Sequence, residues 1–198
     1  LVPRKGQDTL IRALPWVRRA VPDAVLLLVG DGPHGSGLRQ LALREGVLDA
    51  VFFAGGHPHH ALPAFYAAAD AFAMPCRTRR AGLEVEGLGI VYLEAAASGL
   101  PVVAGDSGGA PDTVREGETG YVVDGRSVAA TADRLIRLLR DPRLARAMGE
   151  EGRRRVRAEW SWDHSYATLR HLLVGRTAGC RTVGPRPPHA HRPTAPGT

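Results

Sequence analysis

Cysteine is scarce in this chain: Cys76 and Cys180 are the only two in 198 residues. Two cysteines cannot build the disulfide framework of a small secreted domain, and so low a content is typical of a reducing, cytosolic context. Long apolar runs are lacking as well. A run such as 24–29 is far shorter than the roughly 20 residues of a membrane-spanning helix. Both absences predict a cytoplasmic protein without a membrane span.

Acidic residues are outnumbered by basic ones, and the formal net charge is +6. The excess is concentrated in residues 174–198, which hold four arginines and no acid, so the remainder carries only about +2. That segment is rich in Pro, Gly, Arg and His, and we expect it to be a disordered tail because it lacks the apolar surface to offset its ordering entropy. A basic face with interleaved aromatics is not seen, which argues against a nucleic-acid partner.

The sequence does contain an alternation of short apolar runs and helical patterns. Buried strands are expected at 24–29, 51–54, 71–74, 101–104 and 120–123. Helices are expected at 8–20, 37–45, 62–69, 89–98, 128–140, 142–159 and 162–173, with a helical turn at 110–115. This order with short connections predicts an α/β fold, a Rossmann-like parallel sheet with helices on both faces, over residues 1–173.

Ligands of such sheets bind at the carboxyl ends of the strands, so the loops after strands are where a site is expected. The strongest signal there is a glycine-rich segment between Glu86 and Glu94, two acids eight positions apart. Gly87 and Gly89 allow the backbone to approach a ligand, and the first turn of the following helix attracts phosphate. The carboxylates suit sugar hydroxyls at Glu86 and ribose hydroxyls at Glu94. Two isolated glutamates would be interpreted as surface residues, but the glycines between them favour a ligand-binding site.

Lysine is nearly absent too. Lys5 stands alone against 25 arginines. In a chain so biased toward arginine, a retained lysine indicates a position where a compact point charge is wanted and a guanidinium fork is not. We interpret Lys5 as a phosphate ligand. The alternative is a solvated loop lysine.

The segment from Glu86 to Glu94 resembles the Glu-x7-Glu signature of the retaining GT-B glycosyltransferases, a family that includes sucrose synthases, glycogen synthases and bacterial mannosyltransferases. The resemblance covers about residues 1–173 and implies the C-terminal, donor-binding domain of a GT-B fold. It implies that Glu86 contacts the donor sugar and Glu94 the nucleotide ribose. The diphosphate is then held by the backbone of five consecutive residues: Gly87, Leu88, Gly89, Ile90 and Val91.

Lys5 matches the lysine of the family pattern Gly-Arg-Leu-x-x-x-Lys-Gly, whose two cations neutralise the donor diphosphate. Since the pattern's arginine falls before Leu1, which is itself no initiator methionine, we expect an N-terminally truncated chain. Its first strand and its acceptor-binding domain are then missing. Catalysis is implied for Lys5 and Glu86.

Three further segments resemble parts of the family site. The turn at 30–33 is expected to lie beside the nucleotide, and the glycine turn at 107–112 to support the Glu86 loop. The residues expected to line the base pocket are Gly55, Gly56 and His57. His57, His59 and His60 could instead indicate a metal site, but no acid or cysteine stands at ligand spacing, so neither metal nor cofactor is expected.

The arginine-rich segment 74–94 is longer than in most family members and resembles the phosphatidyl-myo-inositol mannosyltransferases. This implies a GDP-mannose donor, a glycolipid acceptor bound by the missing domain, and peripheral contact with the inner face of the plasma membrane. Alternatives remain open: another nucleotide-sugar donor with a lipid or glycan acceptor, a nucleotide-sugar epimerase of the same fold, or an inactive nucleotide-sugar-binding fragment.

Overall fold

The computed structural model describes residues 1–173. The chain divides into two units, the first spanning Leu1–Ser161 and the second beginning at Trp162. Within the second unit, helix α7 (Trp162–Leu173) has no buried residue. The expected tail at 174–198 lies outside the described residues. None of the described helices combines the length and the apolarity needed to cross a membrane.

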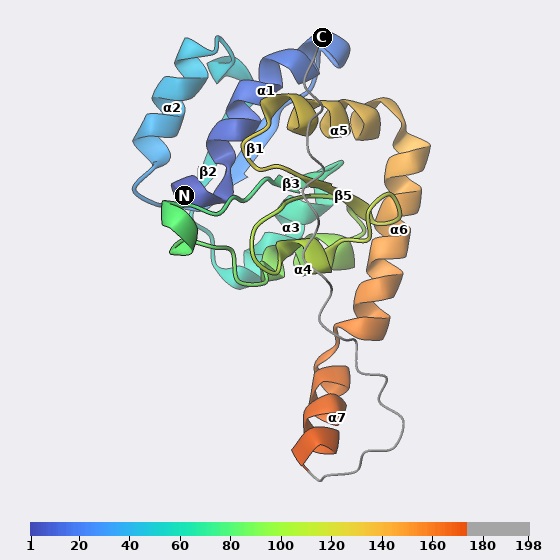
Figure 1. The fold of residues 1–198 in the computed structure, drawn as a ribbon. Coiled ribbons are helices and arrows are strands. Elements are labelled where there is room, and N and C mark those ends of the chain that lie inside the picture. The colour runs from blue at the N-terminus through green and yellow to red at the C-terminus, as the bar shows by residue number, and fades with distance from the viewer. Residues whose placement is uncertain (174–198) are drawn as a thin grey trace, which may run out of the picture. The chain divides into compact units, whose positions relative to one another are not determined.

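All strand pairings in the first unit are parallel, as predicted (Figure 1). The strands are β1 (Leu26–Val29), β2 (Val51–Gly55), β3 (Phe72–Met74), β4 (Val102–Gly105) and β5 (Gly120–Val123). They do not form one sheet, however. They form two, with orders β1-β2 and β3-β4-β5. The prediction of parallel strands with helices on both faces is confirmed, and the division falls between β1 and β3, each of which pairs with a neighbour on one side only.

The helices of the first unit begin and end within two residues of the predicted positions. They are α1 (Gln7–Ala20), α2 (Gly35–Arg44), α3 (Leu62–Ala67), α4 (Ile90–Ala97), α5 (Val128–Arg140) and α6 (Pro142–Glu159). Short 3-10 turns that periodicity did not predict occur at Pro3–Lys5, Leu48–Ala50, His59–Ala61 and Arg80–Gly82. Turns of one or two hydrogen bonds leave no apolar period to detect.

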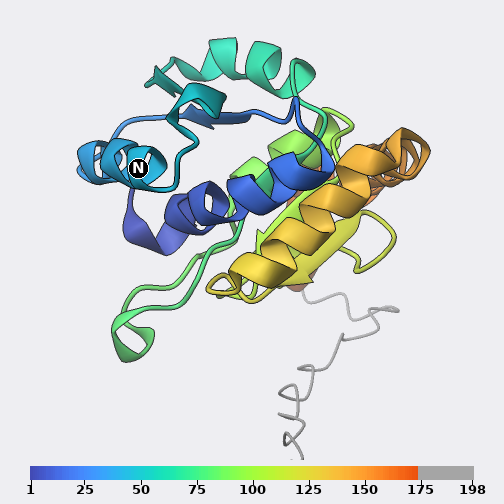
Figure 2. The same ribbon diagram turned by 90° about the horizontal axis from the view of Figure 1, so that it is seen from above.

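Helices cover both faces of the three-stranded sheet. Every residue of β4 is buried. Val102 and Ala104 pack with residues of α4, while Val103 packs on the opposite face with Leu138 of α5. Helix α1 lies beside α5 on this second face, and α6 contacts α4, α5 and β5, so it covers the sheet edge (Figures 1 and 2). Burial on both faces explains why the strands read as continuous apolar runs.

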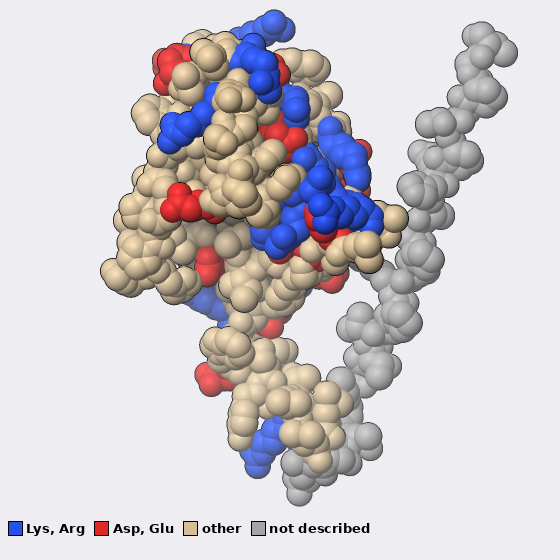
Figure 3. Space-filling view, turned by 90° about the vertical axis from the view of Figure 1, so that its left-hand side faces the viewer, with Lys and Arg blue, Asp and Glu red and all other residues tan. Residues whose placement is uncertain are grey.

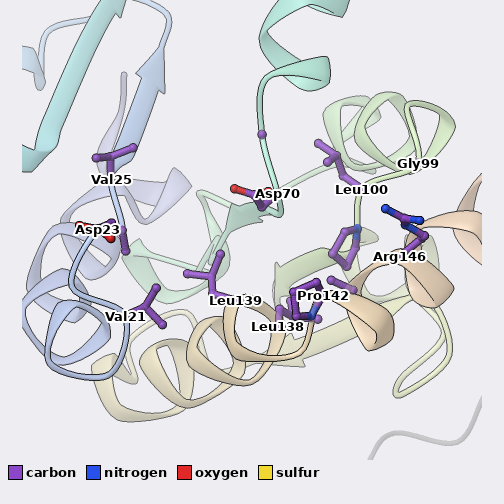
Figure 4. A pocket seen from close by; sticks show the side chains of 14 residues that line it. Val21, Asp23, Val25, Asp70, Gly99, Leu100, Leu138, Leu139, Pro142 and Arg146 are labelled. Atoms are coloured by element: carbon purple, nitrogen blue, oxygen red, sulfur yellow. The ribbon is translucent and has the colours of Figure 1, made fainter.

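A cavity of about 530 Å³ opens at the amino ends of the strands (Figure 4). It is lined by residues that precede β1 and β3, including Asp23 and Asp70, and by the end of α5 and the start of α6, including Leu139 and Arg146. Ligands of parallel α/β sheets bind at the other end, beyond the carboxyl ends of the strands. The cavity is therefore distinct from the predicted donor site.

Candidate functional site

The loops after β3, β4 and β5 meet at the carboxyl edge of the sheet, and glycines make the approach possible. A Cβ added to Gly105 would lie 1.9 Å from the carbonyl oxygen of Cys76, and one added to Gly125 would lie 2.2 Å from the same atom. Thr9, near the start of α1, donates a hydrogen bond of 2.8 Å to the carbonyl of Gly125. The amino end of α1 and three strand ends thus form one floor beneath the site.

The N-terminal turn is fixed to this floor in a way that orients Lys5. Gly6 adopts a left-handed conformation (φ +75°), and a Cβ there would lie 2.0 Å from the carbonyl oxygen of Pro75. The Arg77 amide donates to the Arg4 carbonyl at 2.9 Å. Only a glycine at position 6 tolerates both the conformation and the close approach.

Lys5 and Glu86 form an ion pair, with 2.7 Å between Nζ and Oε2. Their side chains are 23% and 8% exposed, so the pair is largely withdrawn from water. The two residues predicted to be catalytic, 81 positions apart in sequence, are thus brought together. A diphosphate that engages the ammonium group has to compete with this carboxylate, because both are anions.

Asp8 anchors the start of α1 to the loop after β3. Its carboxylate accepts hydrogen bonds from Arg77 at 2.8 and 3.0 Å and from Arg12 at 2.8 Å. Partial burial tends to raise the pKa of Asp8, but the hydrogen bonds and charges of the two arginines outweigh it and lower the pKa. The guanidinium of Arg77 is therefore neutralised here and does not extend toward the site.

The glycine turn after β4 supports the backbone of the Glu86 loop. Ser107 Oγ accepts a hydrogen bond of 3.2 Å from the Glu86 amide, and the Gly109 amide donates to the Gly87 carbonyl at 2.7 Å. A Cβ on Gly108 would lie 1.6 Å from the Glu86 carbonyl oxygen. The prediction that residues 107–112 support this loop is confirmed for its first three residues.

Gly87 and Gly89 both precede α4, but their surroundings differ. Gly89 is the N-cap with φ +75°, and a Cβ there would lie 2.5 Å from the buried ring of Tyr92. No heavy atom lies within 4 Å of the corresponding point at Gly87. Gly89 is therefore needed for the fold, whereas Gly87 leaves open space over the backbone. In the first turn of α4, the Tyr92 amide donates to the Gly89 carbonyl at 2.9 Å, which leaves the amide groups of Ile90 and Val91 for an anion.

Alanine at these two positions is expected to separate stability from ligand binding. Gly89→Ala should lower the melting temperature, because a left-handed conformation costs a non-glycine residue about 1–2 kcal/mol and the methyl group meets Tyr92. Gly87→Ala should keep the wild-type melting temperature but weaken nucleoside diphosphate binding about tenfold, roughly 1.4 kcal/mol. Thermal unfolding and calorimetric titration of both variants check this. Equal destabilisation, or unaltered binding by Gly87→Ala, would contradict it.

Glu94 is held by a residue that the sequence did not single out. Tyr66 in α3 donates a hydrogen bond of 2.8 Å to Glu94 Oε2, while His59 Nδ1 lies 3.9 Å from Oε1. Burial, with the hydrogen bond and negative charge of Glu94, raises the pKa of Tyr66, so its hydroxyl remains a proton donor. In sequence, Tyr66 is one more apolar-face residue of a short helix, and no local signal marks its partner.

The loops after β1 and β2 are joined to each other. The Gly30 amide donates to the Gly55 carbonyl at 2.7 Å, and Asp31 Oδ2 accepts from the Gly56 amide, also at 2.7 Å. Asp31 therefore holds the expected base-binding segment in addition to turning the chain. His57 folds back onto this region, with Nε2 3.1 Å from the Ala54 carbonyl oxygen.

The segment after β2 reaches the Glu94 region through His59, two residues beyond His57. Over residues 1–173, no group of three or more His, Cys, Asp or Glu side chains is arranged to hold a metal ion. What the carboxyl edge does offer is a cation beside a buried carboxylate, a helix start with open backbone, and a second carboxylate with one oxygen anchored. Such an edge can bind a phosphate-bearing ligand that carries hydroxyl groups.

Comparison with known proteins gives a consistent result. The sequence profile of the family described as Glycosyl transferases group 1 matches residues 1–155. The GDP-mannose-dependent alpha-(1-6)-phosphatidylinositol monomannoside mannosyltransferase of Mycobacterium tuberculosis is 57% identical over 178 residues, which are 90% of this chain and 46% of that enzyme. The chain thus spans a little under half the length of this curated relative.

Solved structures agree in fold. The C-terminal domain of a group 1 glycosyl transferase from Francisella tularensis superimposes with a TM-score of 0.72 at 25% identity, covering 82% of this chain and 83% of that one. The Anabaena protein HepE, crystallised with UDP and glucose, gives a TM-score of 0.72 at 27% identity and covers 88% of this chain and 46% of its own.

Proposed function

Because this chain belongs to the group 1 glycosyl transferases, we propose that it is the donor-binding part of a retaining mannosyltransferase that uses GDP-mannose. The acceptor is a glycolipid of the phosphatidylinositol monomannoside type, and the enzyme works at the inner face of the plasma membrane. The single observation that carries the proposal is the meeting of Lys5 with Glu86 beside the open start of α4. The name of the mycobacterial relative supports the donor and acceptor.

The donor is expected to lie along the carboxyl edge of the strands. Glu86 binds hydroxyl groups of the transferred sugar, and Lys5 with the amide groups of Gly87–Val91 binds the diphosphate. Glu94, with Oε2 fixed by Tyr66, keeps Oε1 for a ribose hydroxyl. The segment Gly55–His57 lies against the base. No metal ion is required by this arrangement.

Mannose transfer depends mainly on stabilisation of the leaving group. As the bond between the anomeric carbon and the phosphate oxygen breaks, negative charge collects on the released GDP. The fixed amide groups at the start of α4 meet that charge without reorganising, and Lys5 adds a positive charge once it exchanges Glu86 for the diphosphate. The acceptor hydroxyl attacks on the same face, its proton passes to an oxygen of the departing phosphate, and the anomeric configuration is retained.

A nucleotide comparison tests the proposal. GDP at 100 times its dissociation constant should stabilise the complete gene product by about 2.7 kcal/mol, and UDP or ADP at the same concentration by clearly less. Melting temperatures measured with each nucleotide decide this. A larger shift with UDP, the nucleotide bound to HepE, would keep the donor site and overturn GDP-mannose as donor. The absence of any shift would overturn the donor site itself.

A further inference from the structure

The segment between β3 and α4 carries a protruding hairpin to which the proposed donor site assigns no role. Reciprocal backbone hydrogen bonds of 2.9 and 3.2 Å between Arg79 and Glu84 close it, and residues 80–83 form its tip. We call it the 79–84 hairpin. Figure 2 shows this segment extending away from the helices and strands of the first unit. The tip lies only three residues before Glu86 in sequence.

The backbone of the tip is held in an unfavourable conformation. Arg80, Ala81 and Gly82 have φ values of +51°, +50° and +96°. In the described part of the chain, Arg80 and Ala81 are the two non-glycine residues with positive φ. Strained residues of this kind persist where the surrounding structure imposes them, and they concentrate at sites that bind.

The tip presents an apolar side chain among cations. Leu83 is 86% exposed, although a leucine usually lies inside. Arg79 and Arg80 both pair with Glu84, at 3.0 and 3.1 Å, which leaves a net charge of about +1 within the hairpin. Arg126 adds another cation at its base, where it donates to the Thr78 carbonyl.

The same chemistry is visible on the surface around the hairpin. Figure 3 shows basic side chains gathered on one face of the molecule around fewer acidic ones. Two further apolar side chains are exposed nearby in sequence: Val85, which directly follows the hairpin, and Ile90, the first residue of α4. An exposed leucine surrounded by surplus positive charge matches the interface of a bilayer with anionic headgroups, where apolar side chains enter the acyl boundary and arginines face phosphates.

We propose that the 79–84 hairpin contacts the surface of a bilayer that contains anionic phospholipids. Leu83 enters the interface, and Arg80 with Arg126 faces the phosphates. The contact sets the mouth of the donor site against the surface from which a lipid acceptor is taken. This inference rests on the proposed function, because a membrane-embedded acceptor is what brings the enzyme to a bilayer.

Vesicle binding tests the proposal with the complete gene product. Wild-type protein should sediment with phosphatidylcholine vesicles that contain phosphatidylinositol, and less with pure phosphatidylcholine or at high salt. The double variant Leu83→Ser/Arg80→Gln should bind the anionic vesicles at least about tenfold more weakly. Its matched control is Val25→Ser/Arg143→Gln, at exposed positions near the amino ends of the strands, which should bind like the wild type.

A second measurement separates this proposal from the function on which it rests. Mannose transfer to a mannosylated inositol phosphate without acyl chains should be the same for the wild type and the hairpin variant. Equal vesicle binding by the two proteins, or a wild type that binds no vesicles, overturns the hairpin proposal. If the variant keeps vesicle binding but loses transfer to the soluble acceptor, the hairpin contacts another part of the enzyme instead. A wild type that binds vesicles but transfers no mannose overturns the proposed function alone.

Discussion

Replacing Lys5 by alanine should lower kcat of the complete enzyme by about 10²–10³, the usual loss when one group that meets developing negative charge is removed. The backbone at Lys5 is fixed by the tight turn at Gly6, while Nζ lies 2.7 Å from the buried carboxylate of Glu86 and has to leave that partner to reach a diphosphate. In the proposed site, the ammonium group then meets the negative charge of the leaving diphosphate. Steady-state kinetics with GDP-mannose and the lipid acceptor measure the loss.

Lys5→Arg is the informative companion of this variant. It keeps the charge but replaces a compact ammonium by a planar fork. The Lys5 side chain is only 23% exposed, so the larger group has little room. We expect activity between those of the alanine variant and the wild type. Wild-type kcat in Lys5→Ala would show that this charge does not support the leaving group.

Much of the fold could be predicted because a strand that is buried on both faces is a continuous apolar run in the sequence. The strand 120–123 and the helices 128–140, 142–159 and 162–173 have the bounds that periodicity indicated. The division into two sheets could not be read in this way. An apolar run shows that a strand is buried, but it does not show which neighbour the strand pairs with.

The candidate site was predictable where the residues themselves are unusual. The one lysine of the chain and two glutamates separated by a glycine-rich segment are easily recognised in the sequence. The structure brings Lys5 and Glu86 together. Tyr66 carries no such mark, and for Asp31 the sequence indicates only the turn at 30–33. Their importance lies in partners that are 28 and 25 positions away, Glu94 and Gly56, and only the folded chain reveals those contacts.

Replacement of Glu86 and of Glu94 by glutamine should change the affinity for GDP in opposite directions. Glu86→Gln removes an anion that competes with the diphosphate for Lys5, so GDP should bind about three- to tenfold more tightly, a gain of roughly 0.7–1.4 kcal/mol. Glu94→Gln leaves one acceptor oxygen for two donors, Tyr66 and the ribose hydroxyl of the proposed site, so GDP should bind more weakly. Calorimetric titration of GDP into the two variants and the wild type measures both effects.

Mannose transfer by Glu86→Gln should nevertheless fall by at least about tenfold. In the proposed site, the carboxylate that hinders GDP is also the one that holds the hydroxyl groups of the transferred sugar, and GDP alone has no such sugar. The gain in GDP affinity should therefore shrink or vanish with intact GDP-mannose. Glu84 forms ion pairs with Arg79 and Arg80 of the hairpin, so Glu84→Gln is the matched control; it should change neither GDP affinity nor mannose transfer to an acceptor without acyl chains. If Glu86→Gln weakened GDP binding as Glu94→Gln does, the ion pair with Lys5 would be no barrier to the donor, and Glu86 would instead position Lys5 for the diphosphate.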